Sequence, residues 1–68
     1  MDILTPEDLT SGEYLLDVRS DALRGTRIVT LVHRPSETYV QHEVDGLLYE
    51  GHGQDIVQEM YLHLQRMR

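Results

Sequence analysis

The chain has 68 residues, 40% of them hydrophobic, and its twelve Asp and Glu outnumber six Arg to give a net charge of −6. A chain of this length forms one domain, residues 1–68, with a marginal core, and it contains no cysteine to supply a disulfide or a thiolate metal site. The negative charge disfavours direct binding to nucleic acid or to an anionic membrane and favours attraction to a basic protein surface. No apolar run approaches the roughly 18 residues of a membrane span and no signal-peptide pattern opens the chain, so a cytoplasmic location is expected.

Residues 1–12 are predicted to form an N-terminal arm with a short helix. Thr5 suits the N-cap position and Pro6 the first helical position. Two acids follow directly, where they face the positive end of the helix dipole. Ser11 and Gly12 end the helix after little more than one turn, and the arm is interpreted as structural.

Residues 13–51 are predicted to form a four-stranded antiparallel meander. The expected strands are residues 13–19, 27–34, 38–44 and 47–50. A three-residue loop at positions 35–37 pairs Val32 with Val40. Asp45-Gly46 is typical of a type I′ hairpin turn and leads into the fourth strand.

Residues 54–67 are predicted to form an amphipathic helix that packs on one face of this sheet. Its expected apolar face consists of Ile56, Val57, Met60, His63, Leu64 and Met67. The predicted inner face of the sheet, which this helix covers, consists of Tyr14, Leu16, Val18, Ile28, Thr30, Val32, Val40, His42, Val44, Leu47 and Tyr49. Leu62 points away from the helix's apolar face.

The predicted outer face of the sheet is the main functional clue. The central strand, Ile28 to Val32, is apolar on both sides, which is typical of a strand that is covered on both faces. A single helix covers one face, so a second copy, the N-terminal arm or a different protein must cover the other. The residues predicted to bind a partner there are Val29, Leu31, Tyr39, Glu43, Leu48, Asp17 and Glu50.

The sequence gives weak indications of catalysis or metal binding. His42 and His63 are expected to meet between sheet and helix as ordinary packed residues, and His33 to lie on the opposite sheet face, so no three-ligand zinc set is evident. Ser11, Ser20 and Ser36 fall in predicted turns without a nucleophile-elbow pattern. No catalytic residue, metal site or cofactor is therefore predicted.

Residues 27–64 resemble the strand–strand–strand–helix module of HicB-type antitoxins. The shared pattern begins with a hairpin from Ile28–Arg34 to Tyr39-Val40. A third strand that ends in a glycine follows, and then a helix; residues Glu50 to Ile56 carry this transition. The resemblance implies a protein that binds and neutralises another protein. The chain departs from that family because it has no C-terminal DNA-binding segment and carries an extra N-terminal arm and strand. Its small acidic build is also similar to phage-encoded inhibitors, including anti-CRISPR proteins, which would place it in the host cytoplasm.

The sequence thus predicts an α+β domain with a four-stranded antiparallel meander, a C-terminal helix on one face and a short N-terminal helical turn. The expected function is non-catalytic binding and inhibition of a protein partner with a basic surface, and a homodimer is expected. One alternative is a self-associating structural subunit. A second is a metal-binding hydrolase that depends on His42 and His63.

Overall fold

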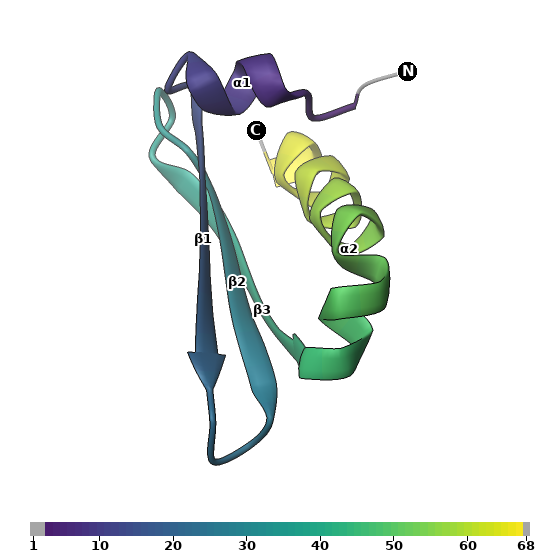
Figure 1. The fold of residues 1–68 in the computed structure, drawn as a ribbon. Coiled ribbons are helices and arrows are strands. Elements are labelled where there is room, and N and C mark those ends of the chain that lie inside the picture. Colours follow the sequence, from purple (N-terminus) through teal and green to yellow (C-terminus); the bar gives the residue numbers. More distant parts are fainter. Residues whose placement is uncertain (1–2, 68) are drawn as a thin grey trace.

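A computed structural model describes residues 3–67 (Figure 1). The chain forms a short helix, three strands and a long helix: α1 (Pro6–Thr10), β1 (Tyr14–Asp21), β2 (Thr26–His33), β3 (Thr38–Asp45) and α2 (Gly46–Met67). The strands make one antiparallel sheet in the order β1-β2-β3, and α2 packs across one of its faces (Figure 1). The α+β class is confirmed, whereas the four-stranded meander is wrong because the sheet has three strands. Residues 1 and 2 of the predicted arm lie outside the described part of the chain.

The short N-terminal helix forms where its capping residues predict it. The Thr5 hydroxyl accepts a hydrogen bond from the backbone N–H of Asp8, and the Asp8 carboxylate accepts one from the backbone N–H of Thr5 at 2.9 Å. This reciprocal capping box satisfies two helix-end donors, and Pro6 occupies a position where no N–H is needed. The prediction for this helix is confirmed.

The predicted fourth strand is the first turn of α2. Asp45 does not begin a hairpin; its carboxylate accepts hydrogen bonds from the backbone N–H groups of Leu47 at 3.0 Å and Leu48 at 3.2 Å, which is N-cap behaviour. Gly46 is required there for space, since a Cβ on it would lie 2.9 Å from the carbonyl oxygen of Gly25. The helix bends at His52, whose backbone is non-helical.

The register between β2 and β3 differs by one residue from the prediction. His33 pairs with Thr38 and Leu31 with Val40, so four residues rather than three form the turn. Glu37 makes the extra residue possible by adopting a positive φ of 57° while its N–H bonds to the carbonyl of Arg34. Because side chains alternate along a strand, this shift by one residue exchanges the two faces of the sheet on which the β2 side chains lie, relative to the side chains of β3.

The core lies between α2 and the sheet face that carries Tyr14, Leu16 and Val40, as predicted for β1 and β3, but the β2 residues on this face are the ones that were predicted on the other side. Val29 and Leu31 are both 0% exposed and pack with apolar side chains from α2, from the two edge strands and from Leu4 of the N-terminal arm. The core members are Leu4, Tyr14, Val29, Leu31, Val40, Val57, Met60, Tyr61 and Leu64. The predicted assignment of Val29 and Leu31 to an uncovered face is therefore wrong. The α2 contact face also differs in detail, because Tyr61 is buried while His63 and Met67 are exposed.

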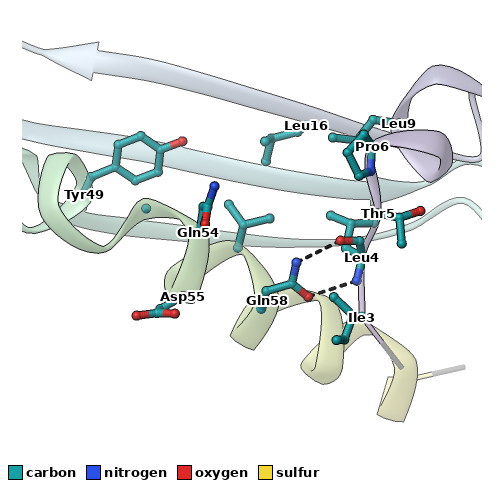
Figure 2. A pocket seen from close by; sticks show the side chains of 12 residues that line it. Ile3, Leu4, Thr5, Pro6, Leu9, Leu16, Tyr49, Gln54, Asp55 and Gln58 are labelled. Atoms are coloured by element: carbon teal, nitrogen blue, oxygen red, sulfur yellow. Dashed lines mark hydrogen bonds between the residues drawn. The ribbon is translucent and has the colours of Figure 1, made fainter. Parts of the chain in front are cut away.

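The N-terminal arm is tied to α2 by one glutamine side chain. The Gln58 carboxamide accepts from the backbone N–H of Leu4 and donates to its carbonyl, both at 2.9 Å (Figure 2). These two bonds hold Leu4 against the core at 6% exposure. Within residues 3–67 no helix combines the length and the apolar character needed to cross a bilayer.

Candidate functional site

The sheet face opposite α2 is not covered by another element among residues 3–67 (Figure 1). Paired residues point to the same side of the sheet, so the register places alternate residues of each strand on this face. We call it the open face, and its members are Leu15, Asp17, Arg19, Asp21, Thr26, Ile28, Thr30, Val32, Tyr39, Gln41, Glu43 and Asp45. Figure 1 shows no helix over this side within the described residues.

The open face has an apolar end and a charged end. Leu15, Val32 and Tyr39 form a continuous row across the three strands near α1, and Leu15 and Tyr39 are 51% and 60% exposed. The next rows become polar and then charged toward the other end of the sheet. A shallow hollow lies between the two ends, bounded by Leu15 and Arg19.

Three charged groups of the open face, Asp17, Arg19 and Glu43, form ion pairs within the chain. Arg19 contacts Asp17 at 3.0 Å, and Arg24 in the β1–β2 turn contacts Glu43 at 3.0 Å. Thr26 also donates to Glu43 at 2.7 Å. These groups are exposed, so each ion pair contributes only about 0–1 kcal/mol to stability and keeps its capacity for other partners.

A second surface lies at the end of the sheet where the β1–β2 turn meets the start of α2. Gly46 donates its N–H to the carbonyl of Gly25 at 2.9 Å, which holds these two segments together. Three leucines project there into solvent: Leu23 at 100% exposure, Leu47 at 79% and Leu48 at 49%. We call this surface the leucine tip.

The leucine tip carries an excess of negative charge. Its charged groups are Asp21, Glu43, Asp45 and Glu50 with Arg24 and Arg27, four acids against two bases, so the local net charge is −2. Arg27 pairs with Glu50 at 3.5 Å and Arg24 with Glu43. Exposed apolar side chains surrounded by like charges are typical of a surface that another protein contacts.

A third feature is an apolar groove between the N-terminal arm, β1 and the first half of α2 (Figure 2). Its lining includes Leu9, Leu16, Tyr49 and Val57. The polar group that spans it, Gln58, already uses both its carbonyl and its amide on Leu4. Residues of the arm form one wall of this groove, and the two Gln58 bonds hold that wall in place.

The structure distributes the predicted partner-binding residues over three places. Val29 and Leu31 lie in the core. Asp17 and Tyr39 lie on the open face, and Glu43 lies where the open face meets the leucine tip. Leu48 lies on the first turn of α2 and Glu50 at the start of the next. Leu15 was predicted on the uncovered outer face but was not named as a contact residue. The exposed Leu23 and Leu47 were not predicted on that face, although an apolar residue in the polar turn at Leu23 and the adjacent pair Leu47-Leu48 could have indicated them.

The histidines also differ from their predicted places. His33 and His42 share one sheet face rather than opposite faces, because the register is shifted. His42 and His63 do meet, with ring centroids 6.4 Å apart, as predicted, but both are exposed rather than packed in the core. Across residues 3–67 no three His, Asp or Glu side chains are grouped so that they would hold a metal ion.

Buried His33 joins two side chains in an order that catalytic sites also use. The Ser36 hydroxyl lies 2.5 Å from His33 Nδ1, and a Glu13 carboxylate oxygen lies 3.4 Å from His33 Nε2. However, Ser36 also bonds the Thr38 hydroxyl at 2.8 Å and belongs to the four-residue turn. It does not line the groove beside the arm, the hollow on the open face or a further hollow beside the start of α2. We interpret this set as a brace for the β2–β3 turn.

Comparison of the sequence with protein-family models and curated proteins, and of the structure with solved structures, finds no match.

Proposed function

We propose that this chain is a non-catalytic protein-interaction module whose leucine tip docks on a protein partner with a basic surface and blocks it. The observation that carries the proposal is the exposure of Leu23, Leu47 and Leu48 beside an excess of acid. Leaving three large apolar side chains in water stabilises nothing in the isolated domain, whereas burying each at an interface contributes about 1.5–3 kcal/mol.

The charge of the tip defines the chemistry of the partner. Asp45 and Asp21 are fixed by hydrogen bonds to the backbone N–H groups of the segments that carry the leucines. The acids are therefore held around the apolar side chains without further ordering when a partner arrives, which lowers the entropic cost of binding. A surface rich in Arg and Lys around an apolar pocket complements this arrangement, and the chain's net charge of −6 accelerates the encounter.

Neutralisation of a partner, which the HicB-type resemblance implies, is part of this proposal. The third strand of that resemblance falls in α2, so residues 27–64 carry the two strands β2 and β3 and a helix rather than three strands and a helix. A protein whose basic surface binds nucleic acid would be blocked by competition, because the acidic tip occupies the same surface. The HicB-type and phage-inhibitor likenesses both lead to this mode of action.

The test compares two charge-altering substitutions on the same helix. Leu47→Arg removes a tip leucine and adds a positive charge, while Leu62→Arg makes the same change at an exposed position near the other end of α2. Tagged wild type and both variants are used to capture proteins from lysate of the source cell, and the captured partner is purified and titrated by calorimetry.

We expect wild type and Leu62→Arg to bind the same partner, and Leu47→Arg to bind it at least about tenfold more weakly, as loss of a central interface residue does. The affinity should also fall as salt is raised, because the tip is charged. The proposal is wrong if Leu47→Arg binds every partner as tightly as Leu62→Arg, or if the partner's own activity is unchanged when the wild-type protein saturates it.

A further inference from the structure

We propose that the open face is the interface of a two-fold homodimer in which the sheets of two copies pack face to face with their strands parallel. This inference goes beyond the proposed function, because its apolar contacts lie on the open face and not on the leucine tip, although Asp21, Glu43 and Asp45 belong to both surfaces. It commits the uncovered side of the sheet to a second copy of the same chain.

The arrangement of side chains on the open face is complementary to itself. A two-fold axis that runs along β2 keeps each residue's height on the sheet and places β1 of one copy over β3 of the other. Leu15 then lies opposite Tyr39 of the second copy, and Arg19 lies opposite Glu43. Each of these contacts occurs twice, so the dimer contains two apolar pairs and two ion pairs of opposite charge.

The centre of this interface is also matched. Ile28, Thr30 and Val32 of β2 lie on the axis, and each meets the same residue of the second copy. All three are β-branched and half-buried, which suits the flat contact between two packed sheets. The shallow hollow beside Leu15 leaves room for the protruding Tyr39 side chain of the other copy.

The alternative two-fold axis, across the strands, gives a worse match. It keeps each strand over itself but reverses the height, so Tyr39 meets Asp45 and Leu15 meets Asp21. The apolar row of each copy is then desolvated against carboxylates, which is unfavourable. The axis along β2 also leaves two copies of a repulsive contact, Asp21 opposite Asp45, at the two corners of one end, where the twist of packed sheets separates the two chains.

The size of the face determines the expected strength of the dimer. Strands of eight residues at about 3.3 Å per residue and three strands at about 4.8 Å spacing give a face of about 26 by 14 Å. The area of a face with these dimensions is smaller than the roughly 800 Å² that each partner contributes to a standard stable interface. We therefore expect a dimer weaker than a standard stable complex, with a dissociation constant roughly in the micromolar to millimolar range.

The parallel arrangement has a structural consequence for the leucine tips. Because an axis along the strands preserves height, both tips lie at the same end of the dimer. Two tips that point the same way can engage a symmetric partner, or two neighbouring sites on one partner, with increased avidity.

The first experiment measures the mass of the protein by sedimentation equilibrium from about 1 μM to about 1 mM, a range that covers the expected dissociation constant. Wild type should approach twice the 7.9 kDa of one chain. Leu15→Glu should raise the dissociation constant about 100-fold, because a tenfold effect at one position is felt at two symmetric sites. Tyr39→Glu tests the same contact from the other strand, and Leu47→Arg, on the tip, should dimerise like wild type.

The second experiment exchanges the charges across the interface. Arg19→Glu should weaken the dimer at least tenfold because Glu then faces Glu43 of the second copy, and the double variant Arg19→Glu/Glu43→Arg should recover most of that loss. Circular dichroism establishes that each variant is folded. The dimer is excluded if wild type stays at 7.9 kDa throughout, or if the Leu15→Glu and Tyr39→Glu variants both dimerise like wild type. A double variant as weak as Arg19→Glu alone would exclude the axis along β2.

The two proposals fail separately. A partner that binds monomeric Leu15→Glu through the tip supports the proposed function without the dimer. If Leu47→Arg still dimerises but no longer binds the partner, the dimerisation supports the two-fold interface and the lost binding supports the contact through the leucine tip.

Discussion

Substitution of Gly46 by alanine tests whether the junction between β3 and α2 is a helix start packed against the β1–β2 turn. The added Cβ would lie 2.9 Å from the carbonyl oxygen of Gly25 and 3.2 Å from Arg27 Nη1. The arginine side chain is able to move, but the Gly25 carbonyl is backbone and already accepts the Gly46 N–H at 2.9 Å. The methyl group therefore separates two segments that this hydrogen bond holds together.

The expected cost follows from two opposing effects. Forcing a methyl group into a tight contact costs about 1–3 kcal/mol. Alanine is a better helix former than glycine by up to about 1 kcal/mol, which offsets part of that cost. We expect Gly46→Ala to lower the free energy of unfolding by about 1 kcal/mol, which in a domain of this size lowers Tm by about 4–8 °C.

The matched control is the same substitution at Gly51, five residues along the same helix, where an added Cβ has no atom within 4 Å. Gly51→Ala is expected to raise the free energy of unfolding by about 0.4–1 kcal/mol, because alanine reduces the entropy of the unfolded chain. Both variants are compared with wild type by urea denaturation followed by circular dichroism at one protein concentration. A Gly46→Ala variant as stable as Gly51→Ala would refute the close contact at the junction.

Three further predictions test the core packing, the cap of α2 and the attachment of the N-terminal arm. Leu31→Ala should lower the free energy of unfolding by about 2–5 kcal/mol, since Leu31 is fully buried, whereas Leu23→Ala should change it by less than about 0.5 kcal/mol; equal effects in urea denaturation would contradict the register. Asp45→Ala should cost about 1 kcal/mol by removing the helix cap, and Asp45→Ser should recover most of this in the same assay, which a hairpin turn would not do. Gln58→Ala should lower the free energy of unfolding by about 1–2 kcal/mol and speed hydrogen exchange at the Leu4 amide. Unchanged exchange at Leu4 would argue against the two hydrogen bonds between Gln58 and the N-terminal arm.

Where local chemistry decides the structure, the sequence was sufficient. The N-terminal helix depends on Thr5, Pro6 and Asp8, which all lie within four residues, so its start is readable without knowledge of the fold. The alternating stretch that became β1 and the 3.6-residue periodicity that placed Val57, Met60 and Leu64 on one face of α2 were likewise predicted correctly. The same reasoning established that a single helix leaves one sheet face uncovered.

Contacts between distant segments decided the rest, and they changed the candidate site. The central strand is apolar on both sides, so its own sequence does not say which side faces α2. The turn before β3 contains one residue more than predicted, Glu37, and the resulting register places Val29 and Leu31 in the core and Ile28 and Val32 on the open face.

The junction at Asp45-Gly46 shows the same limit. Two residues that favour a hairpin equally favour a helix cap, and the approach of Gly25, twenty-one positions away, selected the cap. Sequence alone therefore determined that the domain would have a free face and a net acidic surface. Only the tertiary structure decided which side chains form that face, because strand register and segment contact depend on residues that are far apart in the chain.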